Sequence, residues 1–176
     1  MNRVHIVGRR NSGKTTLIVE LVRELVGRGY TVGTIKHSSH SHELDTPGKD
    51  SHRHRLAGSA PAAVITPTTT AVYLPSLPGA PRYDELEPHY RACDLVLVEG
   101  DQSAPARKVE VWRAETGSEP LVRSLPEIAA VITDDPIDVP VPVWPRAEVT
   151  RLADFLLLLG GEGEVRRQKS KGKSQK

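Results

Sequence analysis

The chain has 176 residues and a formal net charge of +2, a length that suits one α/β domain with a substantial core. Its single cysteine, Cys93, excludes an internal disulfide and a cysteine-rich metal site. No apolar run is long enough to span a membrane, and the N-terminus has no signal-like segment, so we expect a cytoplasmic protein.

The positive charge is concentrated at the C-terminus, where residues 162–176 hold six Lys or Arg and two Glu. Because this tail has almost no apolar side chains to bury, we expect it to be disordered. The rest of the chain carries no net positive charge, so nucleic-acid binding is not expected. The sequence thus predicts a nucleotide-binding domain over residues 1–161 and a basic tail over residues 162–176.

Residues 8–15 read Gly-Arg-Arg-Asn-Ser-Gly-Lys-Thr and match G-x-x-x-x-G-K-[ST], the phosphate-binding P-loop motif. An apolar strand at residues 4–7 precedes the motif and an apolar-periodic helix over residues 13–27 follows it, which is the context that the motif requires. The turn would present backbone N–H groups and the positive helix end to an anion. A glycine turn capped by Ser12 is the structural alternative, but the flanks favour triphosphate binding.

Two side chains of the motif have specific roles in phosphate chemistry. Lys14 can reach the β- and γ-phosphates and stabilise charge on a transferring phosphoryl group, which makes it a candidate catalytic residue. The Thr15 hydroxyl can ligate Mg²⁺. We expect the nucleotide to be bound by the loop and the start of the helix, at Gly8, Asn11, Ser12, Gly13, Lys14, Thr15 and Thr16.

A second strand, residues 30–35, completes a βαβ unit. Its strands should be parallel, and ligands then bind at the carboxyl ends of the strands. Lys36 follows directly, so we expect it at the same sheet edge as the phosphate loop, where it can meet phosphate from a second side. An ordinary exposed lysine is the alternative.

Residues 37–54 form a polar stretch that contains five of the seven histidines. Its His-x-His pairs could ligate zinc, but no cysteine completes a ligand set. We instead expect Asp45 to approach Mg²⁺ and Asp50 to join the residues that bind the nucleotide. Helix capping or surface solvation is the alternative for both carboxylates.

Residues 94–100, Asp-Leu-Val-Leu-Val-Glu-Gly, form a continuously apolar strand that ends in an acid and a glycine. Such strands are buried inside parallel sheets. An acid at the carboxyl end, beside a phosphate loop, stands where a Mg²⁺ ligand is expected. Glu99 is therefore our candidate for a metal-binding and catalytic carboxylate, whereas Asp94, at the opposite end, is expected to be structural.

Periodicity and turn residues predict the other elements. In chain order, they are a helix at 47–57, strands at 62–66 and 70–74, a connector at 75–81, a helix at 84–91, strands at 108–113, 128–132 and 139–144, and a closing helix at 149–159. The fold class is α/β and P-loop NTPase-like, with a mostly parallel sheet flanked by helices and additional antiparallel strands.

Residues 133–136, Thr-Asp-Asp-Pro, form an acidic loop at a strand end. Guanine presents an N1–H and an N2 amino group that would suit an aspartate, but a simple Asp-Asp-Pro turn accounts for the loop equally well. No Asn-Lys-x-Asp motif appears in the chain. The residues alone therefore do not separate GTP from ATP.

Together these motifs resemble the MobB family, molybdopterin-guanine dinucleotide biosynthesis protein B. The resemblance covers about residues 3–159. It rests least on the phosphate loop, which many proteins share, and most on Ile-Lys-His at residues 35–37 and Pro-Gly-Lys-Asp-Ser at residues 47–51. The Asp-to-Gly block at residues 94–100 adds to it.

The resemblance implies a GTP-binding protein with weak GTPase activity that forms a homodimer through sheet strands. It implies a partner, the MobA guanylyltransferase, which attaches GMP to molybdopterin, so this chain would be an accessory protein. It also implies that Lys36, Asp45, Asp50 and Glu99 line the nucleotide site.

One position departs from the family pattern, in which an aromatic residue and a lysine often follow Glu-Gly. Here Asp101 and Gln102 follow, which removes a possible cation near the phosphates and leaves the hydrolysis rate and partner contact open. Two other functions stay possible on the sequence: an ATP-dependent small-molecule kinase or ligase, and a nucleotide-dependent binding module without turnover.

Overall fold

The computed structural model describes residues 1–75 and 83–161, so the predicted tail and most of the predicted connector lie outside it. The chain divides into two compact units. The phosphate-loop unit comprises Met1–Ser38 and the chain from Leu86 onward, and the second unit comprises Ser39–Glu85. Among the described helices, none is long and apolar enough to cross a membrane.

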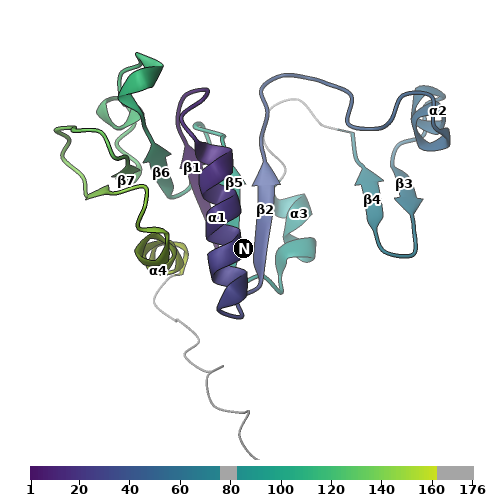
Figure 1. The fold of residues 1–176 in the computed structure, drawn as a ribbon. Helices are drawn as coiled ribbons and strands as arrows, with labels where there is room; N and C mark the ends of the chain where they lie inside the picture. Colours follow the sequence, from purple (N-terminus) through teal and green to yellow (C-terminus); the bar gives the residue numbers. More distant parts are fainter. Residues whose placement is uncertain (76–82, 162–176) are drawn as a thin grey trace, which may run out of the picture. The chain divides into compact units, whose positions relative to one another are not determined.

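A six-stranded sheet with the order β2-β5-β1-β6-β7-β8 forms the centre of the phosphate-loop unit. All of its pairings are parallel, which confirms the predicted sheet type. The carboxyl ends of its strands therefore share one edge, the upper edge in Figure 1. The strands are β1 (Arg3–Val7), β2 (Val32–Lys36), β5 (Leu95–Glu99), β6 (Lys108–Val111), β7 (Ile128–Ile132) and β8 (Val143–Trp144).

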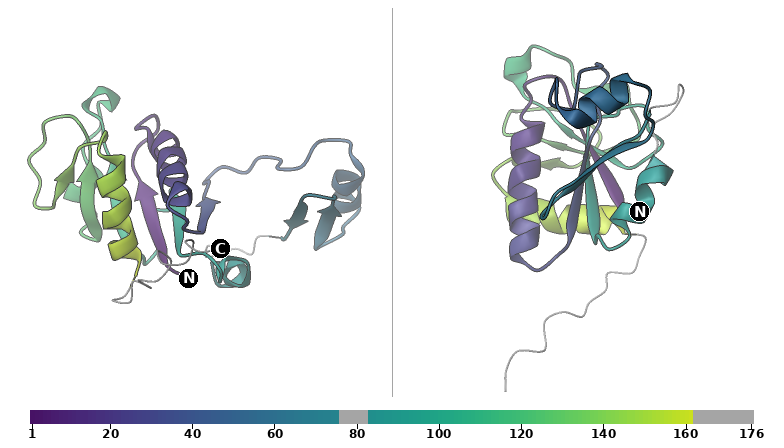
Figure 2. Two further views of the ribbon diagram at one scale, coloured as in Figure 1. Left: turned by 60° about the horizontal axis from the view of Figure 1, so that its bottom comes forward. Right: turned by 90° about the vertical axis from the view of Figure 1, so that its right-hand side faces the viewer.

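Helices cover the two faces of this sheet. The α1 (Lys14–Gly27) and α4 (Val149–Gly160) helices share an apolar core with one face, and α3 (Tyr83–Tyr90) lies on the side opposite α1 (Figure 2). Fully burying one large aliphatic side chain contributes about 1.5–3 kcal/mol, so this core holds the edge that carries the loop in place. Its fully buried members include Val4, Ile6, Leu17, Leu21, Leu25, Leu95, Leu97, Leu152 and Leu156.

The β6 strand is shorter than the predicted strand at 108–113, and all four of its residues are buried although they alternate between polar and apolar. The Lys108 Nζ donates to Ala104 O (2.6 Å) and Ala106 O (3.2 Å). The Glu110 carboxylate accepts hydrogen bonds from the N–H groups of Leu121 (2.7 Å) and Val122 (2.9 Å). The strand lies between β1 and β7, and the adjoining loops satisfy its charged groups, so polarity here does not indicate exposure.

A strand near the sheet edge and the helix of the second unit are also shorter than predicted. The strand expected at residues 139–144 is limited to β8, Val143–Trp144, at the edge of the sheet. Prolines at positions 140, 142 and 145 lack the N–H group that a longer ladder needs. The helix expected at residues 47–57 is α2 (Asp50–Leu56), because the turn at Pro47 and Gly48 lies outside it.

The second unit contains α2 and the antiparallel pair β3 (Ala62–Ile65) and β4 (Thr70–Tyr73), which confirms the predicted antiparallel strands. Among its described apolar side chains, only those of Ala62 and Tyr83 are buried. Its exposed large apolar residues are Leu44, Leu56, Ile65, Val72 and Leu74. An isolated two-stranded sheet of this kind is marginally stable, so its stability depends on contacts outside the hairpin.

Candidate functional site

The phosphate loop leaves β1 at a position that only glycine fits. Gly8 has a φ of +145°, and a Cβ on it would lie 2.3 Å from Val111 O of the neighbouring strand β6. Gly13 has a φ of +93° and precedes α1 with no side-chain cap on the helix. The N-terminal amides of α1 are thus available to an anion, as the motif predicts.

The Lys14 ammonium lies against the loop backbone. Its Nζ donates to Gly8 O (3.0 Å) and Arg9 O (2.6 Å). Burial lowers the pKa of this lysine, and the Glu99 carboxylate partly opposes that change. A partly desolvated ammonium interacts more strongly with a nearby phosphate than one in bulk water.

Glu99 is the point at which three sequence predictions meet. Its Oε1 accepts hydrogen bonds from Thr15 Oγ1 (2.9 Å) and Lys36 Nζ (3.2 Å). The sheet register produces this arrangement, because Glu99 stands beside Ile6 of β1 and beside Lys36 of β2. Thr15 belongs to the first turn of α1, so residues from three separate elements converge at the carboxyl edge of the sheet.

The oxygen donors of this cluster have the chemistry that Mg²⁺ prefers. A hydroxyl and a carboxylate are hard ligands, and Mg²⁺ usually takes only one or two side chains together with substrate phosphates and water. No group of three or more His, Cys, Asp or Glu residues suited to a metal occurs within residues 1–75 and 83–161. Thr15 and Glu99 therefore fit a phosphate-dependent Mg²⁺ site rather than an all-protein metal cage.

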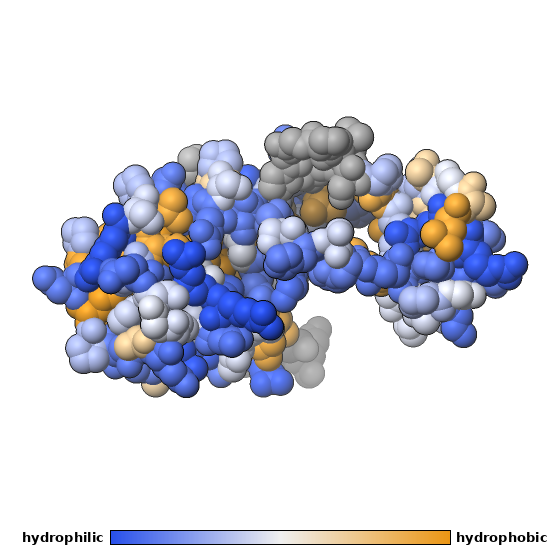
Figure 3. Space-filling model, turned by 90° about the horizontal axis from the view of Figure 1, so that it is seen from above, coloured by the Kyte–Doolittle hydropathy of each residue, from blue (hydrophilic) through white to orange (hydrophobic). Residues whose placement is uncertain are grey.

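The outer side of the loop borders a polar pocket of about 380 Å³. Ser12, which follows the pocket residue Asn11, is only 2% exposed, and its Oγ makes no hydrogen bond with the described residues. Asn11 has a φ of +63°, a conformation that Asn tolerates better than most side chains. Figure 3 views the molecule from above Figure 1, from the side of the carboxyl edge of the sheet, and shows hydrophilic residues over much of the visible surface. The pocket is lined by Arg10, Asn11, Arg113, Glu115 and Thr116.

Two of the predicted site residues, Asp45 and Asp50, belong to the second unit. Asp45 Oδ1 accepts from Ser51 Oγ (3.1 Å) and from the N–H of Thr46 (2.8 Å). Asp50 has an exposed side chain that lies 3.9 Å from Arg53. Their assignments to Mg²⁺ and to the nucleotide remain predictions.

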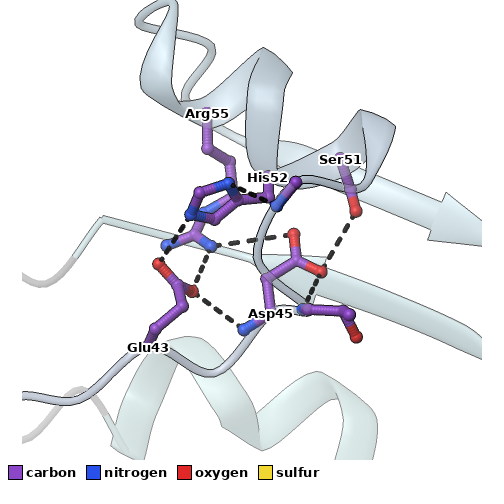
Figure 4. Close-up of polar contacts among 7 residues, drawn as sticks. Glu43, Asp45, Ser51, His52 and Arg55 are labelled. Carbon is purple, nitrogen blue, oxygen red and sulfur yellow. Dashed lines mark hydrogen bonds and ion pairs between the residues drawn. The ribbon is translucent and has the colours of Figure 1, made fainter.

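An ion-pair network that the sequence did not indicate surrounds Asp45 (Figure 4). Glu43 pairs with Arg55 (2.7 Å) and lies 3.5 Å from His52 Nε2. The hydrogen bond from Arg55, followed by one from the backbone of Asp45, lowers the pKa of Glu43 to about 2. The Arg55 guanidinium also lies 4.6 Å from the centre of the Tyr73 ring. This network joins the loop before α2 to the helix and to β4.

Asp101 is a site-supporting residue whose role sequence reasoning missed. It is 5% exposed, and its Oδ1 accepts from the Ala104 N–H (3.1 Å) and Ser103 Oγ (2.8 Å). Gly100 before it has a φ of +90°, and a Cβ there would lie 3.1 Å from His37 O. The sequence did give one signal, because Asp101 is where this chain departs from the family pattern. In the structure, the Asp101 side chain stabilises the turn after Glu99.

Three comparisons relate this chain to known proteins. The family model described as "Molybdopterin guanine dinucleotide synthesis protein B" matches residues 3–134. The "Molybdopterin-guanine dinucleotide biosynthesis adapter protein" of Haemophilus influenzae is 35% identical over 163 residues, covering 86% of this chain and 85% of the relative. The Escherichia coli protein of the same name is 32% identical over 154 residues, covering 83% and 86%.

Solved structures show the same fold. The MobB structure of Bacillus subtilis superposes with a TM-score of 0.69 at 27% identity, covering 92% of this chain and 99% of that one. A MobB homolog from Bacillus stearothermophilus gives a TM-score of 0.63 at 29% identity, covering 89% and 96%.

Proposed function

The chain belongs to the MobB family, and from this membership we propose that it is a GTP-binding adapter in molybdopterin guanine dinucleotide biosynthesis. The observation that carries the nucleotide part of the proposal is the convergence of Lys14, Thr15, Lys36 and Glu99 at one sheet edge. Each of these side chains has a role in binding a triphosphate. The chain acts in the cytoplasm in this proposal.

In the nucleotide-bound state, each predicted site residue has a specific role in this proposal. The N-terminal amides of α1 and the Lys14 ammonium bind the phosphates, and Lys36 contacts them from β2. Thr15 and Glu99 would hold Mg²⁺, which neutralises phosphate charge when it is bound. Asp45 would be a further Mg²⁺ ligand and Asp50 a further nucleotide contact in this proposal. The other predicted contacts come from Gly8, Asn11, Ser12, Gly13 and Thr16.

Hydrolysis by this site is slow in the proposal. Lys14 would stabilise charge on the terminal phosphate, and Mg²⁺ would add to this stabilisation when bound. The sequence offers no clear glutamine to orient an attacking water, because Gln102, the glutamine nearest Glu99, lies beyond the turn at Asp101. A weak GTPase suits an adapter, whose task is to bind a nucleotide and a partner rather than to turn over substrate.

The adapter acts with an enzyme that transfers GMP to molybdopterin, a MobA-like guanylyltransferase, and it works as a homodimer. Support for the dimer comes from the second unit, where Leu56, Ile65 and Val72 are exposed on α2, β3 and β4. Exposed apolar groups on a small open sheet favour association with another chain.

An ATP-dependent small-molecule kinase or ligase is not favoured. The curated relatives that match most of the chain are named as adapters. A kinase or ligase would also need an acceptor and a base beside the terminal phosphate, and the predicted residues supply phosphate and metal contacts instead.

Calorimetric titration of the purified chain with GTP and with ATP, each with and without Mg²⁺, tests the proposal. We expect tighter Mg²⁺-dependent binding of GTP than of ATP, whereas a preference for ATP would overturn the proposed function. Deleting residues 162–176 is expected to leave the affinity for GTP unchanged, because the nucleotide-binding domain is placed at residues 1–161. A large loss would assign the tail to the site.

A further inference from the structure

Two adjacent acids follow β7 at the carboxyl edge, and the structure gives them different surroundings. Asp135 is half-buried, and its Oδ2 accepts a hydrogen bond from the Ala114 N–H (2.8 Å). Its own N–H donates to Thr133 Oγ1 (3.0 Å). Asp135 is therefore a structural residue that joins the loop after β7 to the loop after β6.

Asp134 is exposed but held in place. Its Oδ1 accepts a hydrogen bond from the N–H of Arg146 (2.7 Å), which ties the loop after β7 to the loop after β8. Within the described part of the chain, its other oxygen, Oδ2, makes no hydrogen bond. The exposed carboxylate is thus held by one oxygen, which leaves the other without a hydrogen bond to the described residues.

Arg146 also fixes this corner against α1, the helix that begins at the phosphate loop. Its guanidinium pairs with Glu20 Oε2 (2.6 Å). Glu20 is six residues beyond Lys14, a helical rise of about 9 Å. Asp134 is therefore tied through Arg146 to α1. It also follows β7, which is two strands from β1 in the sheet, about 10 Å at the usual strand spacing. Asp134 thus lies on the same carboxyl edge as the phosphate loop and to one side of it. All of these residues belong to the phosphate-loop unit.

We propose that Asp134 recognises the guanine base of the bound nucleotide and sets the preference for GTP over ATP, an inference that rests on the proposed GTP binding. Guanine presents N1–H and the N2 amino group side by side, and a carboxylate accepts from both donors at once. Adenine presents an unprotonated N1 at the corresponding position, whose lone pair would face the carboxylate. The same group thereby attracts guanine and rejects adenine.

The Asp134→Asn variant provides a direct test, because it preserves the loop and changes only the recognition chemistry. The asparagine Oδ1 can still accept from the Arg146 N–H, so the fold is retained. Its Nδ2 is a donor and no longer matches the N2 amino group of guanine. It does match xanthine, which carries a carbonyl oxygen at that position.

We would titrate the wild-type chain, Asp134→Asn and the control Asp138→Asn with GTP, ATP and xanthosine triphosphate. Asp138 is exposed in the same loop, so its substitution matches the charge change. We expect Asp134→Asn to weaken GTP binding by about 10- to 100-fold and to strengthen xanthosine triphosphate binding, with Asp138→Asn unchanged.

The outcomes separate the two levels of the proposal. A gain in xanthosine triphosphate affinity cannot come from a misfolded protein, so it would establish the role of Asp134. If the wild-type chain prefers GTP and Asp134→Asn retains that preference, the assignment of Asp134 is wrong while the proposed function stands. If the wild-type chain does not prefer GTP, the proposed function itself is wrong.

Discussion

The phosphate-loop unit and the second unit hold their charged side chains in opposite ways. In the phosphate-loop unit, Lys108 and Glu110 are 1% and 0% exposed, and backbone groups satisfy both of them. In the second unit, Glu43 and Arg55 meet at the surface, with side chains 35% and 30% exposed. The phosphate-loop unit has a large apolar core, whereas the second unit has few buried apolar side chains among its described residues.

The difference indicates which parts of the molecule are preformed. Buried hydrogen bonds to charged groups are costly to break, so the loops around the phosphate site are fixed by the core of their own unit. Exposed ion pairs contribute little, so the stability of the second unit depends more on solution conditions. We expect substitutions in the first unit to have the larger effects.

The largest effect is expected from Lys14→Ala. The substitution removes the ammonium that is proposed to bind the phosphates, and GTP affinity should fall about 100-fold or more, since charge-assisted hydrogen bonds are worth about 1.5–3 kcal/mol each. Calorimetry measures the loss. Arg23→Ala, on an exposed face of the same helix, is the control and should bind normally. Unchanged GTP affinity in Lys14→Ala would show that residues 8–15 do not act as a phosphate-binding loop.

Glu110→Gln is expected to destabilise the phosphate-loop unit by about 2–3 kcal/mol, because one of two buried backbone N–H groups then faces an amide donor. Denaturant unfolding measures this change. Glu119→Gln, whose side chain is 76% exposed, should change stability by less than about 0.5 kcal/mol. Equal effects of both substitutions would contradict the contrast between buried and exposed charges.

Glu99→Gln should reduce the enhancement of GTP affinity by Mg²⁺ about tenfold, since an amide oxygen is a weaker ligand than a carboxylate. Titrations at several Mg²⁺ concentrations measure the effect. Glu127→Gln, an exposed residue before β7, is the control. An unaltered Mg²⁺ dependence would show that Glu99 is not a metal ligand.

The smallest effect is expected from the network of the second unit, and it depends on pH. Folding lowers the pKa of Glu43 from 4.5 to about 2, so the ionised form is favoured in the folded state. Its stabilisation is complete above pH 4.5 and is lost as the pH falls toward 2. Limited proteolysis of the second unit should therefore be slow at pH 6 and faster near pH 3.

Glu43→Gln removes this ionisable group and should make the second unit more easily cleaved at pH 6, with a weaker response to acid. Asp84→Asn, at an exposed position of the same unit, serves as the control. If Glu43→Gln leaves both the cleavage rate and its pH dependence unchanged, the network does not hold the unit together.

Local patterns predicted much of the site. The glycine and lysine spacing located the loop, and the apolar run before Glu99 located its strand, because a strand buried on both faces is recognisable by continuous hydrophobicity. The alternating pattern at residues 108–113 located a strand but not its surroundings. Only the neighbouring loops determine that the charged residues Lys108 and Glu110 of β6 are buried.

The sequence by itself determined the phosphate loop, the parallel sheet and the family, since these depend on local spacing and on side-chain periodicity. Only the tertiary structure decided that Lys36 and Thr15 meet at Glu99, residues separated by up to 84 positions in the chain. It also distinguished Asp135, bonded to Ala114, from Asp134, bonded to Arg146. Such roles depend on partners that strand order brings together, and strand order follows from packing of the whole sheet rather than from neighbouring residues.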